Sequence, residues 1–275
     1  MRPRPDVIDL VAALKARDEP FALATVVRTV AATAAKAGAK AVIRPDGSIS
    51  EGWIGGGCAR AAVLGAARAA LADGRPRLVS ILAQDLFAER QLSHGEEREG
   101  VRFARNMCPS QGSMDVFVEP MLPRPALVIL GASPVAVALA ELGPRFGYRV
   151  TVCAAPEDQA LFAETDQRIE GYTLPVEGEG KRFLVIATQG RGDEAALKAA
   201  LSVEAEHVAF VGSRRKVLAL GRSLIADGLA PERVARVKGP AGLDLGAITP
   251  EEIALSILAE ILAIRRHGQR SGAGN

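Results

Sequence analysis

The chain has 275 residues, enough for two domains with separate cores, because domains most often contain about 100–150 residues. Lys and Arg total 34 against 32 Asp and Glu, so no overall field of one sign attracts nucleic acid or an anionic membrane. No apolar run reaches the ~20 residues that span a bilayer, and the first residues lack a hydrophobic signal core. We therefore expect a cytoplasmic protein.

The first half of the chain mixes helical and strand patterns. Residues 6–16 carry apolar side chains at helical spacing, and an alanine-rich segment over 59–71 favours a second helix that Gly74 terminates. Residues 84–105 are polar and charged without a clear period, so we expect them to form a connection. Together with the strands, these elements predict a mixed α/β domain over residues 1–122. The expected strands are 21–29, 40–44, 50–54, 77–82 and 114–120.

The second half opens on a βαβ unit at residues 126–155. A run of branched apolar residues ends at Gly131, which allows a sharp turn, and Pro134 suits the first turn of a helix. Strands alternate with helices from there onward, which predicts a Rossmann-like, doubly wound parallel sheet over residues 123–275. The later elements expected are strands at 182–187 and 207–211 and helices at 193–201, 214–227 and from Thr249, where Glu252 completes a capping box.

The cysteines are the first candidate site. Gly55, Gly56 and Gly57 lead directly into Cys58 at an expected helix start, where the helix dipole lowers the pKa of a thiol. The alternative is a small buried cysteine under a tight turn. Cys108 lies in a turn-rich loop, which alone favours a structural interpretation, and Cys153 ends a hydrophobic strand and is expected in the core. The three histidines stand far apart in the sequence, which argues against a preformed zinc site.

The glycine turn of the second half is the next candidate. A dinucleotide fingerprint needs a second glycine, where Ser133 stands here, and an acidic residue at the end of the second strand, where this chain has Ala154 and Ala155. Glu157 or Asp158 could replace the missing acid only from farther along the loop, so tight NAD(P) binding is disfavoured. Phosphate contact through backbone N–H groups after Gly131 and Ser133 stays open.

Two further loops carry polar groups. Gly212 and Ser213 precede three cations at a helix start, Arg214, Arg215 and Lys216, where an anion would relieve the conflict with the helix dipole. A solvated charge cluster explains the same pattern. In a glycine-rich loop, Asp244 either faces the cleft at the strand ends or braces the turn.

Four motifs together resemble the xanthine dehydrogenase accessory protein family, which includes accessory proteins of carbon monoxide dehydrogenase. They are Glu51-Gly52-Trp53-Ile54-Gly55-Gly56-Gly57-Cys58, Asp115-Val116-Phe117-Val118-Glu119-Pro120, Gly212-Ser213-Arg214-Arg215-Lys216 and Gly242-Leu243-Asp244-Leu245-Gly246-Ala247-Ile248-Thr249-Pro250-Glu251-Glu252-Ile253-Ala254.

The resemblance implies a maturation factor that binds the molybdenum–pterin cofactor (molybdopterin), assists its sulfuration and delivers it to a molybdenum hydroxylase. Cys58 matches the glycine-loop cysteine of the family and would be the principal ligand or sulfur acceptor, with Cys108 assisting. Thiolates suit molybdenum and sulfur transfer. Gly131, Ser133, Gly212, Ser213, Arg214, Arg215 and Asp244 are the other candidates for cofactor contact.

The leading hypothesis is thus a cofactor-insertion chaperone rather than a catalyst, working with a molybdenum hydroxylase and a cysteine desulfurase and forming a homodimer. One alternative is an NAD(P)-dependent oxidoreductase built on the C-terminal domain. Another is a non-catalytic docking protein that presents its target enzyme to another factor.

Overall fold

The computed structural model describes residues 6–107, 111–162, 164–175 and 180–270, with the backbone alone at Cys58 and at 267–270. The chain divides into two compact units, Met1–Pro123 and Arg124–Asn275. Among the described residues, none of the helices is both long and apolar enough to cross a membrane.

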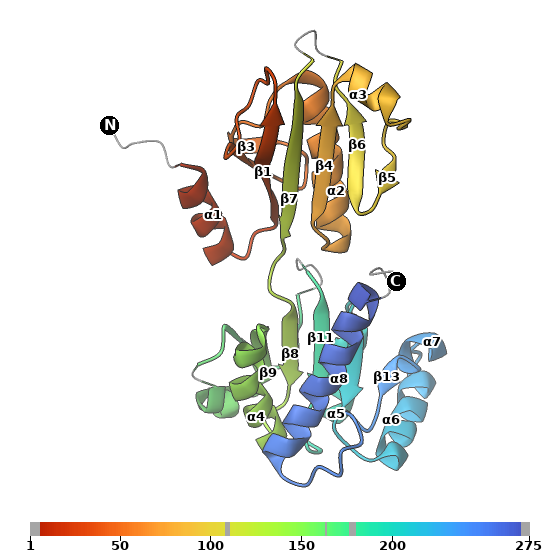
Figure 1. Ribbon diagram of the computed structural model, residues 1–275. Helices are drawn as coiled ribbons and strands as arrows, with labels where there is room; N and C mark the ends of the chain where they lie inside the picture. The colour runs from red at the N-terminus through yellow and green to blue at the C-terminus, as the bar shows by residue number, and fades with distance from the viewer. Residues whose placement is uncertain (1–5, 108–110, 163, 176–179, 271–275) are drawn as a thin grey trace, which may run out of the picture. The chain divides into compact units, whose positions relative to one another are not determined.

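The first unit is a mixed sheet of seven strands in the order β3-β2-β1-β7-β4-β6-β5 (Figure 1). β4 and β6 run parallel, and the other neighbouring strands are antiparallel. The strands are β1 (Phe21–Val30), β2 (Lys40–Ile43), β3 (Ile49–Gly52), β4 (Arg77–Leu82), β5 (Glu97–Arg98), β6 (Val101–Arg105) and β7 (Ser113–Met121). The helices are α1 (Val7–Ala16), α2 (Gly57–Asp73) and α3 (Gln84–Glu89).

Helix α2 covers one face of this sheet. Its buried residues Val63, Ala66, Ala67 and Ala70 pack on side chains of β1, β4 and β7, and small alanines let the helix lie close to the strands. Gly74 ends the helix in the left-handed conformation, as predicted. Helix α1 packs in a separate cluster with Phe21, Leu23, Val42 and Met121.

The connection expected over residues 84–105 is wrong, because this segment contains α3, β5 and β6. β6 pairs in parallel with β4, and Leu82, Phe87 and Leu92 form a small buried cluster with Phe103 packed against it. Its few apolar residues are separated by charged ones. The pairing with β4, rather than a repeating pattern of its own, therefore decides the structure of this segment.

The second unit confirms the predicted Rossmann-like parallel sheet. Its strand order is β10-β9-β8-β11-β12-β13, and every neighbouring pair is parallel. This is the order of a doubly wound dinucleotide fold, in which the winding direction reverses between the first and fourth strands, here β8 and β11. The strands are β8 (Ala126–Leu130), β9 (Arg149–Ala154), β10 (Gln167–Glu170), β11 (Arg182–Ile186), β12 (His207–Phe210) and β13 (Val237–Lys238).

Helices cover both faces of this sheet (Figure 1). α4 (Pro134–Leu142) and α8 (Pro250–Arg270) pack on the face that includes Leu127, Ile129 and Val185, while α5 (Asp193–Leu201) and α6 (Arg214–Ala226) cover the other. The capping box at the start of α8 is confirmed: the Glu252 carboxylate accepts from the N–H of Thr249, and the Thr249 hydroxyl accepts from the N–H of Glu252. The sequence analysis missed α7 (Pro231–Val234) and the short edge strands β10 and β13.

Candidate functional site

Helix α2 begins at the three-glycine turn. Gly55 and Gly57 have φ values of +100° and +50°, a region that residues with a Cβ rarely adopt. Gly56 is the N-cap residue and has no side chain with which to cap the helix, and the first turn contains no acidic residue. The positive end of the helix dipole is therefore not offset by a carboxylate within its own first turn.

The two candidate thiols are only partly placed. Cys58 is the second residue of α2, and its backbone is described while its side chain is not. Cys108 lies outside the described residues. A Cβ built at Gly55 would lie 3.8 Å from Cε of Met114, so the start of α2 is next to the start of β7. β6 ends at Arg105 and β7 begins at Ser113, and both of these strand ends lie at the end of the sheet where α2 begins (Figure 1).

A groove of about 570 Å³ lies beside the first half of α2. On one side it is lined by small residues of α2, Ala61, Ala62 and Gly65, which begin one turn after Cys58. On the other side it is lined by Arg102 and Arg105 of β6, of which Arg102 has its side chain on the sheet face that α2 covers. We call this the α2 groove, and its remaining lining residues are Val79, His94, Gly95, Phe103, Ala104 and Met107.

The charged end of Arg105 points away from α2. Its guanidinium lies over the Phe87 ring at 5.1 Å, and its Nε is buried without a hydrogen-bond partner among the described residues. Phe87 clusters with Leu82 and Phe103, whose side chains alternate with those that pack on α2, so this guanidinium lies on the face of the sheet opposite α2. Arg102, on the face that α2 covers, is therefore the cation that an anion in the groove would meet. The sequence analysis missed Arg102 and Arg105 because it treated their segment as a connection; the apolar residues beside them were the available signal.

In the second unit, a cavity of about 390 Å³ opens at the point where the winding direction reverses. In open α/β sheets, ligands bind at this place, outside the carboxyl ends of the strands. Of the predicted residues, Gly131 and Ser133 line it. We call it the switch-point pocket, and its other lining residues are Ala132, Ala155, Glu157, Asp158, Tyr172, Thr188, Gln189 and Arg191.

The glycine turn before α4 is packed tightly. Gly131 has a φ of +117°, and a Cβ there would lie 2.5 Å from the carbonyl oxygen of Ala187. The N–H of Gly131 donates to Cys153 O at 2.9 Å, and the N–H of Ser133 donates to Ala187 O at 3.3 Å. The Ser133 hydroxyl accepts from the N–H of Ala136, and Pro134 has no N–H. Three N–H groups that could otherwise contact a phosphate, those of Gly131, Ser133 and Ala136, therefore already have acceptors.

The start of α6 is tied to the loop after β11. Lys216 Nζ lies 2.6 Å from the carboxylate of Asp193, so the charge of Lys216 already has an anionic partner. Burial opposes ionisation of Asp193, but hydrogen bonds from Lys216, Thr188 and the N–H of Gly190 together hold its pKa below the usual range.

The remaining predicted residues of this unit are spread along its surface. Ser213 caps α6 by accepting from the N–H of Lys216, and Gly212 accommodates the Phe210 ring. Arg214 and Arg215 are exposed and line a separate hollow of about 410 Å³ with Leu218 and Arg222. Asp244 is exposed and lies outside the lining of the switch-point pocket.

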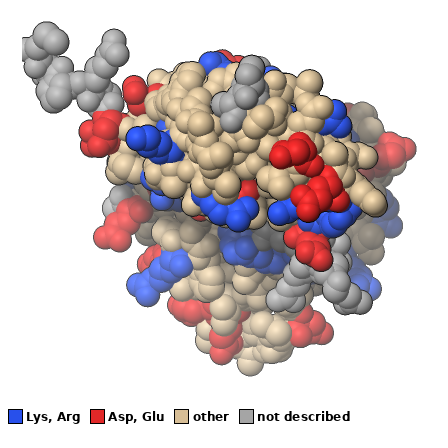
Figure 2. All heavy atoms as spheres, turned by 45° about the horizontal axis from the view of Figure 1, so that its top comes forward, with Lys and Arg blue, Asp and Glu red and all other residues tan. Residues whose placement is uncertain are grey.

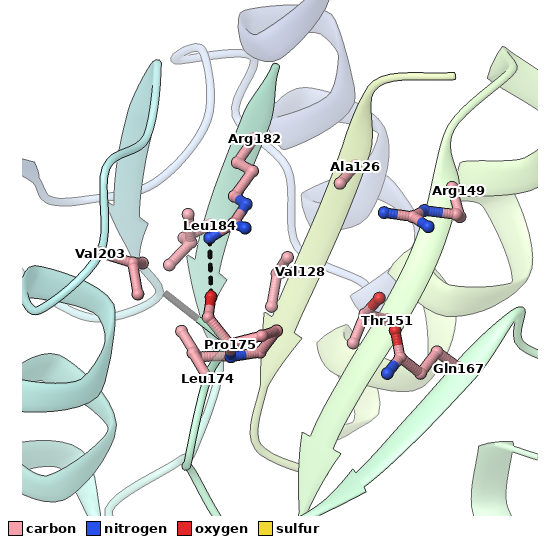
Figure 3. Close-up of a pocket in the computed structure, with 10 residues that line it drawn as sticks. All are labelled: Ala126, Val128, Arg149, Thr151, Gln167, Leu174, Pro175, Arg182, Leu184 and Val203. Carbon is pink, nitrogen blue, oxygen red and sulfur yellow. Dashed lines mark hydrogen bonds between the residues drawn. The ribbon is translucent and has the colours of Figure 1, made fainter. Parts of the chain in front are cut away.

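Another pocket, shown in Figure 3, lies at the amino ends of the strands, where Ala126, Arg149 and Arg182 begin β8, β9 and β11. It encloses only about 60 Å³, and Arg182 there donates to the carbonyl oxygen of Pro175 at 2.9 Å. Ligand pockets have volumes of about 300–1,000 Å³, so this hollow is too small for a cofactor.

Cys153 is confirmed as a core residue. It is fully buried, and burial raises the pKa of its thiol to about 12, so it stays protonated. Within the described ranges, we find no group of three or more His, Cys, Asp or Glu residues that could hold a metal ion. Basic and acidic side chains are interspersed on the face shown in Figure 2, in keeping with the near-neutral net charge.

The chain matches the family described as "XdhC Rossmann domain" over residues 127–261 and the one described as "XdhC and CoxI family" over residues 14–81. It belongs to the XdhC and CoxI family. The family predicted from the four sequence motifs is thereby confirmed, and the switch-point pocket belongs to its Rossmann domain.

Two curated relatives match the chain. One is an Escherichia coli (strain K12) protein named "Uncharacterized protein YqeB", 32% identical in an alignment of 264 residues that covers 93% of this chain and 46% of that protein. The other is a Bacillus subtilis (strain 168) protein named as a probable xanthine dehydrogenase subunit. It is 29% identical over 160 residues, which are 55% of this chain and 46% of that protein. The chain spans about half the length of these relatives.

Among solved structures, a crystal structure described as a xanthine dehydrogenase from Bacillus halodurans aligns with 98% of both chains. The sequence identity is 19% and the TM-score is 0.47.

Proposed function

We propose that this chain is a maturation factor for a molybdenum hydroxylase such as xanthine dehydrogenase. It would bind the molybdenum–pterin cofactor as its cargo, assist its sulfuration with sulfur from a cysteine desulfurase, and deliver it to the client enzyme. The family supports a role of this kind, and the name of the Bacillus subtilis relative suggests the client.

The observation that carries the proposal is the start of α2 beside the α2 groove. Gly56 leaves the helix start without a side-chain cap, and Cys58 follows two residues later. A helix start favours a thiolate, which is a soft ligand for molybdenum and a nucleophile for sulfur transfer. Arg102 would hold the phosphate of the pterin in the groove. We thus assign Cys58 as the principal ligand or sulfur acceptor, with Cys108 assisting.

The α2 groove fits such a cargo by size and charge. Its volume of about 570 Å³ is within the range of ligand pockets. The small residues Ala61, Ala62 and Gly65 leave room for a flat ring system along the helix. This proposal puts the phosphate in the first unit, whereas the sequence motifs suggested Arg214, Arg215 or Lys216 of the second.

The test is to purify the protein from a host that makes the cofactor and to measure bound molybdenum and pterin. The wild type should carry both, and Cys58→Ala should lose most of each. Cys153→Ala is the matched control, because this thiol is buried in the core of the other unit and should not affect loading. Equal loading of wild type and Cys58→Ala, or no loading of either, contradicts the proposal.

A second pair of variants tests the groove. Arg102→Gln should lower the affinity for the cofactor by about tenfold or more, since a hydrogen bond to a charged group contributes about 1.5–3 kcal/mol and about 1.4 kcal/mol is a factor of ten. Arg98→Gln on β5, outside the groove lining, is the control. If a molybdenum hydroxylase still co-purifies with a Cys58/Cys108 double variant while no wild-type cofactor is found, the chain is a docking protein instead.

A further inference from the structure

The switch-point pocket contains polar groups that the cofactor-delivery proposal does not use. Glu157 and Asp158 lie just after β9, at the beginning of a short 3-10 helix over Pro156–Phe162. Arg191 lies across the pocket in the loop after β11, with its side chain 82% exposed. Two carboxylates and one guanidinium thus face a cavity of about 390 Å³.

Asp158 and Arg191 remain available for a ligand. The distance between Asp158 Oδ2 and Arg191 Nη1 is 3.8 Å, which makes an ion pair but exceeds the length of a hydrogen bond. The acceptor positions of this carboxylate and the donors of this guanidinium are therefore not consumed by each other. A ligand whose hydroxyl groups donate to Asp158 and whose anionic oxygen accepts from Arg191 would satisfy both side chains.

The loop that carries Arg191 is held in place. Asp193 accepts hydrogen bonds from Thr188 and from the N–H of Gly190, and the Tyr172 hydroxyl donates to the carbonyl oxygen of Arg191 at 3.2 Å. Gln189, at the centre of this loop, has a φ of +51°, which is uncommon for a residue with a Cβ. Strained backbone of this kind is found most often at ligand sites, where the surrounding contacts maintain it.

We propose that the switch-point pocket binds one ribonucleoside monophosphate unit, with its ribose diol on Glu157 and Asp158 and its phosphate on Arg191. The two carboxylates of the pocket lie near the end of the second strand of the sheet, where a Rossmann fold binds a ribose. The phosphate goes to Arg191 because the N–H groups of Gly131 and Ser133 are already bonded to backbone oxygens. The pocket offers a single guanidinium, and two N–H groups of the glycine turn are already bonded, so a second phosphate would lack donors and NAD should bind more weakly than a monophosphate.

This inference does not depend on cofactor delivery, since it concerns residues of the second unit alone. The nucleotide could arrive free or as the nucleotide end of a larger molecule. The chemistry that both sources share is a vicinal diol next to a phosphate monoester or a single phosphate link.

The test is isothermal titration of the full chain with the four ribonucleoside 5′-monophosphates, their 2′-deoxy forms, the parent nucleosides and NAD. At least one ribonucleotide should bind. Its 2′-deoxy form should bind about tenfold more weakly, because one hydrogen bond to a carboxylate is lost. The parent nucleoside and NAD should each bind more weakly by a similar factor. Mild acid releases any ligand bound to the purified protein, and the identity of that ligand distinguishes a free nucleotide from the nucleotide end of a larger molecule.

Variants assign the contacts. Glu157→Gln with Asp158→Asn should remove the preference for ribose over 2′-deoxyribose, and Arg191→Gln should remove the preference for the monophosphate over the nucleoside. Glu141→Gln and Arg145→Gln, exposed on α4 and in the turn after it, are controls that should leave both preferences unchanged. Circular dichroism checks that each variant is folded.

Any one of three results overturns the proposal: no ribonucleotide binds at about 1 mM, ribo and 2′-deoxy forms bind equally, or NAD binds as tightly as the monophosphate. Cys58→Ala should bind nucleotide like the wild type. Failure of molybdenum loading and failure of nucleotide binding are therefore separate results.

Discussion

The starts of α2 and α4 make an instructive comparison, because in each unit a strand and a glycine turn lead into a helix. Before α2 the N-cap is Gly56, and its first turn has no acidic side chain. Before α4 the N-cap is Ser133, whose hydroxyl accepts from the N–H of Ala136, and Pro134 follows. The availability of a helix start for an anion thus depends on the cap residue rather than on the presence of a glycine turn.

The largest expected effect on stability comes from Gly131, in the tightly packed turn before α4. Gly131→Ala should destabilise the protein by about 3–5 kcal/mol, because strain at positive φ adds to a clash with Ala187 O. Gly57→Ala should be milder, at about 1–2 kcal/mol, since φ is +50° but nothing lies within 4 Å of the added Cβ. Urea unfolding of both variants measures the difference, and equal losses would show that the two turns are equally packed.

The next effect concerns the contact between the β11 loop and α6. Asp193→Asn should destabilise the protein by about 1–3 kcal/mol, because Lys216 loses its ionic partner. The loss is not larger because Lys216 is partly exposed and water can solvate its charge. The pKa of Asp193 is lowered in the folded state, so its stabilising contribution is present above the ordinary Asp pKa of about 3.9 and is lost as pH falls below it.

Unfolding measured as a function of pH should therefore show a smaller acid-side loss for Asp193→Asn than for the wild type. Asp227→Asn, which breaks an exposed pair with Lys198, is the control and should change stability by less than about 1 kcal/mol. An identical pH dependence in wild type and Asp193→Asn would refute the role given to this carboxylate.

A smaller effect tests the cap that closes α4. Ser133→Ala should lower stability by about 1 kcal/mol, since the N–H of Ala136 loses its acceptor. Ser133→Asn keeps a cap and should stay near the wild type. Thermal unfolding compares the three proteins, and a loss of the same size in Ser133→Asn would mean that packing, not capping, accounts for it.

The smallest effect on stability is expected at the open start of α2. Gly56 has φ −110° and ψ −178°, which residues with a Cβ adopt freely, and an added Cβ would approach only the Trp53 ring, at 3.9 Å. Gly56→Asp should therefore raise stability, by about 0.3–1 kcal/mol, by placing a carboxylate at the helix start.

The same substitution should lower molybdenum and pterin content, because the carboxylate competes with an anionic thiolate or ligand. Gly56→Asn supplies a cap without the charge and is the matched control. If Gly56→Asp is more stable but carries as much cofactor as the wild type, the helix start does not take part in cofactor binding.

Several features follow from local sequence alone. The glycine turns, the capping box at Thr249, the buried strand before Gly131 and the helix that Gly74 ends are decided by residues within a few positions of one another. Their physical causes are local too, namely backbone conformation and capping hydrogen bonds. The two-unit division and the alternating pattern that predicts the Rossmann-like sheet are also readable from the chain.

Tertiary structure decided the rest. β6 exists because β4 offers an edge to pair with, and β10 and β13 are short strands held by the parallel neighbours β9 and β12. The α2 groove needs Arg102 of β6 to lie beside α2, and the switch-point pocket needs Asp158 and Arg191, 33 positions apart, to face each other at 3.8 Å. Such pairings join residues distant in sequence, and only the packing of the whole unit brings them together.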